Sequence, residues 1–242
     1  MKALLLAAGM GTRLKPLTDH VPKCLVPICG VPLLDIWLKV LNHAGVDRFL
    51  VNTSYMAESV EAHLSSSIFA SKIEIRREPE LLGTAGSIRQ YRKWVGDDDV
   101  IIAHADNLSI CDYSAFMRKY FARSVGIIGT MMTFSTDTPE SCGIISLNEE
   151  GSIKYYWEKD LKSEGNLANA AVYIASPQFC DYIASSDAFD LSLDVIPKIY
   201  KRLNVFRNDV YHRDIGTLAS FALAQVEYQA LKSNYKLLHS IL

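Results

Sequence analysis

The apolar and polar residues of the first half alternate between strand-like runs and segments with helical spacing. Residues 2–7 form a nearly continuous apolar run that ends in a glycine loop, as in a strand buried on both faces. Apolar residues at positions 34, 37, 38 and 41 follow one helical face, and Gly45 would end that helix. The same pattern predicts strands at Arg48–Thr53, 72–76, Val100–His104 and 125–134, and helices at 57–64, from about Thr84, and at 113–122. Because parallel strands need crossover connections, this order predicts an α/β fold with a doubly wound, mainly parallel sheet.

After about Ser135 the pattern changes to shorter strands with a tight connection. Gly143–Leu147 and Ile153–Glu158 flank a turn-like Asn-Glu-Glu-Gly sequence, which predicts a hairpin, and Leu167–Ala175 is a further strand. Short helices are expected to start near three positions: Pro177, Pro197 and Thr217. We therefore expect an insertion of antiparallel strands laid against the first sheet. The chain would be one domain, 1–242, with a core at 1–134, a lobe at 135–215 and a C-terminal helical segment at 216–242.

The composition is that of an ordinary globular protein and excludes several classes. The 242 residues include 25 Lys+Arg and 27 Asp+Glu, and 49% are apolar, so the chain is neither disordered nor a nucleic-acid binder that depends on neutralising phosphates. No apolar run approaches the roughly 18 residues of a membrane span, and we expect no membrane partner. Five scattered cysteines without a CxxC pair indicate reduced thiols in a cytoplasm and no structural zinc site. The six histidines are equally dispersed and are expected to be surface or core residues rather than ligands.

A small-residue loop after the first strand carries the first candidate chemistry. Residues 6–14 read Leu-Ala-Ala-Gly-Met-Gly-Thr-Arg-Leu, and Pro22-Lys23 follows them. Backbone N–H groups of such a loop can approach an anion closely, because glycine has no Cβ to block the approach. The third glycine of the dinucleotide fingerprint and the phosphate-loop lysine motif are both absent. Arg13 and Lys23 could clamp a polyphosphate held in the loop; a tight turn with two surface cations is the alternative.

With further motifs in the same order, the chain resembles the sugar-1-phosphate nucleotidyltransferases, or nucleotide-sugar pyrophosphorylases. The motifs run from residue 1 to about 220: 6–14, Pro16-Leu17-Thr18, Pro22-Lys23, the Glu-Leu-Leu-Gly-Thr-Ala-Gly of 80–86, Ala105-Asp106, Glu158-Lys159, the Asn-Ala-Ala-Val-Tyr of 169–173, and Asp214-Ile215-Gly216-Thr217. The resemblance implies a Rossmann-like nucleotide-binding core at 1–134 and an inserted sugar-binding lobe at 135–215. That division agrees with the two parts that the alternation of elements predicts.

The resemblance also implies a reaction. A sugar 1-phosphate attacks the α-phosphorus of a nucleoside triphosphate, which gives an NDP-sugar and pyrophosphate. The attacking phosphate oxygen is already ionised at neutral pH, so the step needs no general base. It needs two polyanions brought into line, cationic side chains and a divalent metal ion, for which Mg²⁺ is expected.

Individual roles follow from the same resemblance. Arg13, Lys23 and Asp106 would be catalytic, and Asp106 with Asp214 would hold Mg²⁺. The nucleotide would contact the first loop, the 80–86 loop and the catalytic residues: Leu6, Ala8, Gly9, Met10, Gly11, Thr12, Arg13, Lys23, Glu80, Gly83, Thr84, Ala85 and Asp106. The helix expected from about Thr84 would offer free N–H groups to the base or ribose. The sugar phosphate would contact a second set: Asn107, Gly143, Glu158, Lys159 and Asn169.

Some of these residue types also occur in purely structural settings. Asp106 could cap a turn, and Glu158-Lys159 could be an ordinary surface pair. The chain also departs from the family around the sugar set: Cys142 replaces a frequent aromatic residue, Asp160 a proline, and Ala171 a glycine. None of these changes removes a charge that the chemistry needs, so we expect them to bear on which sugar is used.

The 82–85 loop is most similar to that of mannose-1-phosphate guanylyltransferases, and the length is similar to that of heptose-1-phosphate guanylyltransferases and N-acetylmuramic acid 1-phosphate uridylyltransferases. We therefore favour guanylyl transfer from GTP to a mannose- or heptose-type 1-phosphate, in nucleotide-sugar biosynthesis for a cell-envelope polysaccharide. Uridylyl transfer to N-acetylmuramic acid 1-phosphate or another hexose 1-phosphate is the alternative.

Two hypotheses come from other classes: a non-catalytic regulatory subunit that binds nucleotide sugars, and a glycosyltransferase. The second is disfavoured because the DxD sequence of Asp97-Asp98-Asp99 precedes its strand. The apolar spacing near the C-terminus could serve a homo-oligomer contact or the core: Tyr228, Leu231, Tyr235 and Leu238.

Overall fold

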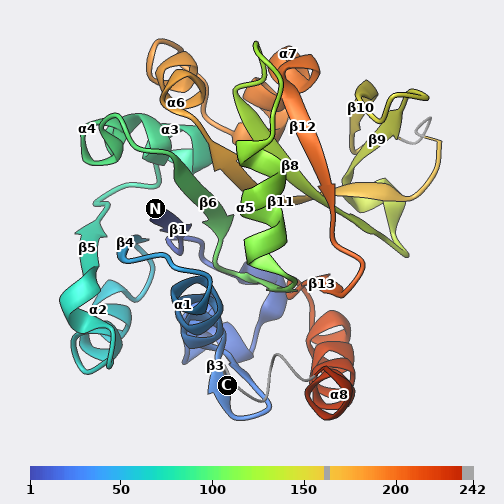
Figure 1. Cartoon of the computed structure of the whole chain (residues 1–242). Helices are drawn as coiled ribbons and strands as arrows, with labels where there is room; N and C mark the ends of the chain where they lie inside the picture. The colour runs from blue at the N-terminus through green and yellow to red at the C-terminus, as the bar shows by residue number, and fades with distance from the viewer. Residues whose placement is uncertain (161–163, 236–242) are drawn as a thin grey trace.

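The chain folds around one mixed β-sheet in a computed structural model that describes residues 1–160 and 164–235 (Figure 1). The strands run in the order β10 (Ile153–Glu158), β9 (Gly143–Leu147), β11 (Leu167–Ala175), β6 (Val100–His104), β1 (Lys2–Leu6), β4 (Arg48–Thr53) and β5 (Ile73–Arg77). β8 (Gly129–Ser135) pairs with β11 and with β12 (Leu203–Arg207). The four strands β6, β1, β4 and β5 are parallel, as the alternation of elements predicts.

Helices cover both faces of this sheet, because successive residues of the central strands enter two different hydrophobic cores. Leu5 packs in one core and Leu4 in the other. The first core includes α1 (Leu33–His43), α2 (Ala57–Ser65), α5 (Tyr113–Phe121) and α8 (Leu218–Asn234). The second includes α3 (Gly83–Gln90), α4 (Arg92–Val95), α6 (Pro177–Ala184) and α7 (Ile196–Ile199). The predicted doubly wound α/β fold is therefore confirmed.

Short helical turns fill the connections between these elements. The 3-10 helices are Thr12–Leu14, Leu17–Asp19, Lys23–Leu25, Ala70–Lys72, Pro139–Ser141 and Tyr200–Arg202, and a π-helical turn spans Leu191–Val195. A small two-stranded hairpin joins β2 (Pro27–Ile28) to β3 (Val31–Pro32). Among the described residues, no helix is both long enough and apolar enough to cross a bilayer.

The inserted antiparallel strands differ from the expectation in one respect. They extend the first sheet edge to edge rather than lying against it, because β11 pairs antiparallel with β6, β8 and β9. The predicted strand at 125–134 begins only at Gly129, since Val125 is fully exposed and Gly126 has φ +89°. The predicted hairpin of β9 and β10 is confirmed, with Glu158 opposite Gly143.

The parallel strands bring several loops to one edge of the sheet. In the register, Leu6 at the end of β1 lies opposite both His104 of β6 and Asn52 of β4. The loops that follow these strands therefore leave from the same edge, which is where open α/β sheets bind ligands.

A second small sheet explains how distant carboxylates meet at that edge. β7 (Asn107–Ile110) follows β6 after a two-residue turn and pairs antiparallel with β13 (Tyr211–Asp214). The register places Asp214 opposite Asn107, next to Asp106. The spacing of apolar residues predicted neither strand.

The C-terminal apolar residues pack into the core as far as the structure describes them. Tyr228 is fully buried, and Leu231 and Tyr235 pack partly buried against the same core. Leu238 lies outside the described residues. These three contacts favour packing in the core, rather than a subunit contact, as the reason for the spacing.

Ala171 offers a test of the backbone strain in β11. Its φ of +52° lies in the left-handed region, at the point where the pairing register with β8 shifts. An alanine there costs about 1–2 kcal/mol relative to its usual conformations. Glycine avoids that cost but loses about 0.5–1 kcal/mol to chain entropy.

We therefore expect Ala171→Gly to leave the free energy of unfolding unchanged or to raise it by up to about 1 kcal/mol. The matched control is Ala168→Gly, three residues away on the same strand and fully buried, which should lower it. Chemical denaturation measures both values. Equal destabilisation by the two substitutions would contradict the strain at Ala171.

Candidate active site

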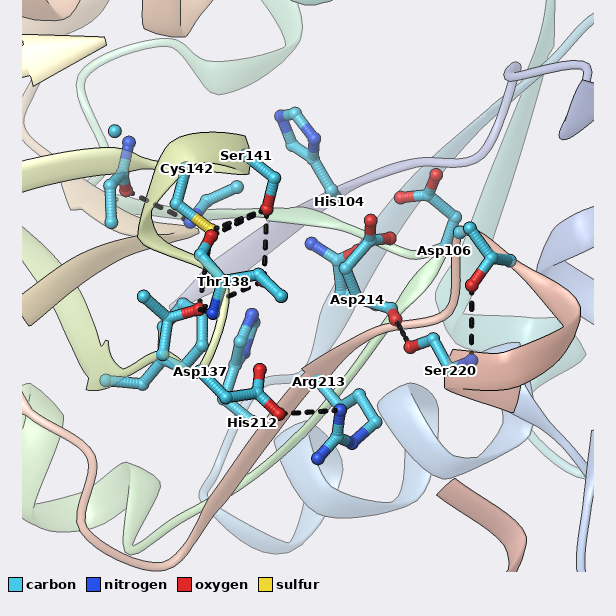
Figure 2. A pocket seen from close by; sticks show the side chains of 18 of the residues that line it. His104, Asp106, Asp137, Thr138, Ser141, Cys142, His212, Arg213, Asp214 and Ser220 are labelled. Atoms are coloured by element: carbon cyan, nitrogen blue, oxygen red, sulfur yellow. Dashed lines mark hydrogen bonds and ion pairs between the residues drawn. The ribbon is translucent and has the colours of Figure 1, made fainter. Parts of the chain in front are cut away.

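A cleft of about 770 Å³ opens at the carboxyl edge of the parallel strands. Its walls come from the end of β6, the β8–β9 connection, the β9–β10 hairpin, β11, β13 and the start of α8. Nine of the residues expected in the site line it: Arg13, Lys23, Asp106, Asn107, Gly143, Glu158, Lys159, Asn169 and Asp214. In Figure 2, Asp106 and Asp214 lie on one side of the view and Thr138, Ser141 and Cys142 on the other. The structure thus brings the segments around Arg13 and Lys23, the inserted lobe and the 212–223 segment to one cavity.

A lysine holds the two predicted metal-binding carboxylates together. Lys23 Nζ lies 2.7 Å from Asp106 Oδ2 and 3.4 Å from Asp214 Oδ1. The Lys23 side chain is only 6% exposed, so solvent screens its contact with Asp106 little, whereas the Asp214 side chain is 52% exposed. Arg13 extends the cluster, because one of its terminal nitrogens lies 3.6 Å from Asp214 Oδ2. The four residues predicted to handle phosphate and metal therefore form one connected cluster.

Lys23 and Asp106 keep their charges in spite of burial. Burial alone would raise the pKa of Asp106, but the charge of Lys23, the His104 imidazole and hydrogen bonds outweigh it and hold that pKa below its usual value. Burial would likewise lower the pKa of Lys23, but Asp106 and Asp214 together raise it. Lys23 is therefore a fixed cation and Asp106 a fixed anion at neutral pH.

Two glycines make room for this cluster. A Cβ at Gly216 would lie 2.6 Å from Asp214 Oδ2 and 3.0 Å from an Arg13 nitrogen. Gly11 has φ +63°, and a Cβ there would lie 3.0 Å from the Cβ of Lys23. Larger residues at either position would displace the charged side chains.

The first loop has the backbone groups that an anion needs. Gly9, Met10 and Thr12 are exposed, and among the described residues the N–H groups of 9–12 have no hydrogen-bond partner. Leu6 and Ala8 are instead buried and do not line the cleft. Only Arg13 of this loop reaches the cleft, so the exposed loop lies beside the cavity rather than inside it.

A buried network that sequence analysis missed joins this loop to the 80–86 loop. Asn52 accepts a hydrogen bond from the Ala7 N–H at 2.7 Å and donates to Glu78 Oε1 at 3.0 Å and to Ser87 at 3.1 Å. Ser87 and Tyr91 donate to the same Glu78 oxygen, at 2.7 and 3.0 Å. Asn52 is the penultimate residue of β4, directly after the apolar Phe49–Val51 run, and a buried polar residue there was the one available sign of its role. The network fixes the distance between the two loops expected to bind the nucleotide.

One expectation for the 80–86 loop is wrong. Ala85 is fully buried, and its N–H donates to the Phe189 carbonyl at 3.0 Å, so it is not free to bind a base or ribose. Thr84 is also engaged, because its hydroxyl accepts a hydrogen bond from Leu191 N at 2.6 Å. Gly83, at φ +73°, is covered by Phe189, whose carbonyl would collide with any Cβ there. Glu80 remains exposed beside them. The segment around Phe189 is far away in sequence, so no local pattern could reveal this contact.

Two of the residues expected to contact the sugar phosphate lie side by side on the β9–β10 hairpin. Glu158 pairs with Gly143, and the Tyr156 hydroxyl donates to Glu158 Oε2. A Cβ at Gly143 would collide with both of those side chains, which explains the glycine. Burial raises the pKa of Glu158 above its usual value, although Tyr156 and Lys159 oppose the shift.

Asn169 is held in place by its neighbours on β11. It donates to the Tyr173 hydroxyl at 2.6 Å and accepts from the Ala171 N–H at 3.0 Å. The left-handed backbone at Ala171 makes this second bond possible. The alanine at the family's glycine position therefore keeps the turn that aims Asn169 at the cleft.

Two histidines also line the cleft, and no sequence motif pointed to them. His104 ends β6 and His212 lies on β13, where its ring is 4.2 Å from that of Phe134. Burial lowers the pKa of both, that of His212 to about 3 with help from His104 and Arg213. His104 Nε2 and His212 Nδ1 are buried and have no partner among the described residues.

The residues present fit a magnesium ion. The described part of the chain has no group of three or more His, Cys, Asp or Glu side chains arranged around one point. It has two carboxylates, Asp106 and Asp214, that contact the same cation, Lys23. Mg²⁺ is commonly held by one or two carboxylates with substrate phosphates and water, so two are enough.

The DxD sequence lies away from this site. Asp98 pairs with Lys2 at 2.8 Å and Asp99 accepts from the Tyr120 hydroxyl at 2.5 Å. Both precede β6 at the edge of the sheet opposite to Asp106. The expectation that this sequence does not hold the metal of a sugar donor agrees with that position.

The comparisons with known proteins agree with this geometry. A family model described as "Nucleotidyl transferase" matches residues 2–230, so the chain belongs to the nucleotidyl transferase family. The resemblance on which the expected enzyme class rests is thereby confirmed.

Two named relatives and one solved structure are similar along most of the chain. A UTP–glucose-1-phosphate uridylyltransferase of Synechocystis sp. is 30% identical over 82% of this chain and 55% of its own length. A D-glycero-α-D-manno-heptose 1-phosphate guanylyltransferase of Aneurinibacillus thermoaerophilus is 29% identical over 95% of this chain and 99% of its own length. The crystal structure of HddC from Yersinia pseudotuberculosis has a TM-score of 0.78 at 26% identity and covers 94% and 99% of the two chains, and that protein has also been solved with GMP-PN. The chain thus spans about half of the first relative and nearly all of the other two.

The Asn52 network generates a prediction about stability. Asn52→Ala removes three buried hydrogen bonds, leaves the Ala7 N–H unpaired and takes away one of the three donors to Glu78 Oε1. We expect the free energy of unfolding to fall by about 2–3 kcal/mol, because unpaired buried polar groups are costly. Chemical denaturation tests this value. Asn42→Ala is the control, since among the described residues the Asn42 side chain accepts a hydrogen bond only from the exposed Lys72 side chain. An equal loss in both variants would contradict the network.

Proposed function

We propose that the chain catalyses Mg²⁺-dependent transfer of a nucleotidyl group from a nucleoside triphosphate to a sugar 1-phosphate, with release of pyrophosphate. The observation that carries the proposal is the cluster of Lys23, Arg13, Asp106 and Asp214 in a cleft beside an exposed glycine loop. Cations and carboxylates so arranged suit a reaction between two phosphates that repel each other.

The first loop, Arg13 and Lys23 would each bind a different part of the reacting phosphates. The N–H groups of 9–12 bind triphosphate oxygens, and Arg13, which is 70% exposed, reaches the outer phosphates. Lys23 is fixed and charged, so it can stabilise negative charge at the α-phosphate without reorganising. No side chain has to remove a proton, because the attacking phosphate oxygen is already ionised.

Asp106 and Asp214 would hold Mg²⁺, which supplies positive charge at the reacting phosphates when it is bound. Asp106 lies in the turn between β6 and β7 and Asp214 ends β13, so the ion would tie this turn to the end of β13. The remaining ligands would come from phosphates and water, as is usual for this ion.

The sugar phosphate would bind on the hairpin side of the cleft. Glu158 can accept hydrogen bonds from sugar hydroxyls, and Lys159 can bind the phosphate. Asn107, Asn169 and the Gly143 backbone would complete the contacts. The nucleotide base would lie over the exposed part of the 80–86 loop, at Glu80, because Ala85 is engaged with Phe189.

GTP is the favoured nucleotide and a mannose- or heptose-type 1-phosphate the favoured acceptor. The name of the Aneurinibacillus relative, which matches along its whole length, supports this choice. The name of the Synechocystis relative supports uridylyl transfer as the alternative. The two names describe nucleotidyl transfer to a sugar 1-phosphate with different nucleotide bases.

Of the three predictions that the proposed function generates, the first concerns the substrates. Each of four nucleoside triphosphates is combined with a panel of sugar 1-phosphates that includes mannose, glucose, N-acetylmuramic acid and manno-heptose, with Mg²⁺ present. Pyrophosphate release should be highest with GTP and a manno-configured acceptor. Binding of nucleotide sugars without release from any pair would instead identify a regulatory subunit.

The second prediction concerns the metal. Asp106→Asn removes a ligand charge and should lower Mg²⁺-dependent kcat by at least 100-fold while the fold remains intact. Asp97→Asn is the matched control, because it changes an exposed carboxylate at the other end of the same strand. Near-normal turnover by Asp106→Asn would remove this carboxylate from the site.

The third prediction separates the two halves of the cleft. Arg13→Ala should lower kcat/KM for the triphosphate strongly, because it removes charge from the phosphate-binding side. Glu158→Gln should weaken use of the sugar phosphate more than use of the nucleotide. Steady-state kinetics with each substrate varied in turn measures both effects, and a change in Arg13→Ala confined to the KM for sugar would contradict the assignment.

A further inference from the structure

Residues 186–193, which follow α6, are fastened to the first turns of α3. The Ala85 N–H donates to the Phe189 carbonyl at 3.0 Å. Arg89 donates to two further carbonyls of the segment, at 2.9 Å each. The 80–86 loop leads into this helix. The loop over which the nucleotide base is proposed to lie therefore also holds a segment that is far away in sequence.

Thr84 holds the part of this segment that faces the cleft. Its hydroxyl accepts a hydrogen bond from the Leu191 N–H at 2.6 Å and donates to Asp190 Oδ2 at 3.4 Å. Leu191 is fully buried, so water cannot readily replace the hydroxyl as the partner of this N–H. The residues on either side of Leu191, Asp190 and Ser192, both line the cleft. The hydroxyl of Thr84 thus fixes a stretch of the cleft wall.

Ser192 in turn lies beside a residue that orients the proposed sugar-binding carboxylate. Its carbonyl oxygen is 3.4 Å from the Tyr156 hydroxyl, and this hydroxyl donates to Glu158 Oε2. A shift of the backbone at 190–192 would therefore move the hydroxyl that holds Glu158. Contacts consequently run without a break from the 80–86 loop to the sugar side of the cleft.

We propose that Thr84 is a positioning residue for the sugar side of the cleft, although it belongs to the loop expected to bind the nucleotide. Its hydroxyl holds residues 190–192, which hold Tyr156 and thereby orient Glu158. This inference rests on the proposed function, since it assigns a new role within the same cleft. A residue that acts in this way changes the use of one substrate and leaves the use of the other intact.

The experiment compares Thr84→Val, which keeps the shape and loses the hydroxyl, with Thr84→Ser, which keeps the hydroxyl. Steady-state pyrophosphate release gives the KM for each substrate, with the best substrate pair of the wild type. Thr84→Val should raise the KM for the sugar 1-phosphate by about fivefold or more, because it leaves a buried N–H unpaired. The KM for the triphosphate should change by about twofold or less, and Thr84→Ser should restore the sugar KM to within about twofold of the wild type.

Ser185→Ala is the matched control. It removes a hydroxyl that donates to the Tyr182 carbonyl at 3.1 Å, directly before the segment, and Ser185 lies outside the cleft lining. Both KM values of this variant should equal those of the wild type. A fivefold rise in its sugar KM would show that any lost hydroxyl near the segment has the same effect, and would overturn the role of Thr84.

Tyr156→Phe tests the route and does not depend on whether Thr84→Val folds. It should raise the KM for the sugar 1-phosphate and leave that for the triphosphate within about twofold. In the double variant, Thr84→Val should add less than about twofold to the sugar KM, because residues that act through one another are not additive. An unchanged sugar KM in Tyr156→Phe, or a full fivefold addition in the double variant, would overturn the route.

The remaining outcomes separate this inference from the reaction itself. If Thr84→Val raises the KM for the triphosphate as much as that for the sugar, Thr84 belongs to the nucleotide site, and the transferase still stands. Failure of the wild type to release pyrophosphate with any substrate pair would overturn both proposals.

Discussion

The contact of one lysine with two carboxylates joins three separate segments of the chain at the cleft. Lys23 Nζ lies 2.7 Å from Asp106 and 3.4 Å from Asp214, two residues more than one hundred positions apart in the chain. Such a buried cation and its partners depend on each other, because removing one leaves an uncompensated charge. The pairing of β7 with β13 makes the contact possible, and the glycines at 11 and 216 keep it free of obstruction. The proposed phosphate and metal sites both depend on this arrangement.

Much of the fold could be predicted from hydrophobic spacing, and the failures have a common cause. Buried parallel strands such as β1 and β6 are continuous apolar runs, and α1 has a clear apolar face, so local pattern was enough for them. β7, β12 and β13 are short and half polar, and they are strands only because distant segments pair with them. The same long-range pairing joins β11 to β6 and turns the expected separate layer into an extension of the sheet.

In the candidate site, too, local sequence pattern revealed some residues and long-range contacts decided the rest. Arg13, Lys23, Asp106 and Asp214 could be found because their motifs combine residue type with order along the chain. The free N–H expected at Ala85 is wrong because Phe189, a remote residue, occupies it. His104, His212 and the Asn52 network were missed because a single polar residue in a strand has no periodic signal. Motifs identify groups that act on substrates, whereas the residues that position them appear only in three dimensions.

The central claim is that Asp106 and Asp214 share one divalent ion with a bound triphosphate. Mn²⁺ can replace Mg²⁺ and be followed by electron paramagnetic resonance in the presence of a non-hydrolysable GTP analogue. We predict that Asp106→Asn and Asp214→Asn each weaken Mn²⁺ binding to the nucleotide complex by about tenfold or more, because each removes a ligand charge. Unchanged Mn²⁺ affinity in either variant would contradict the claim.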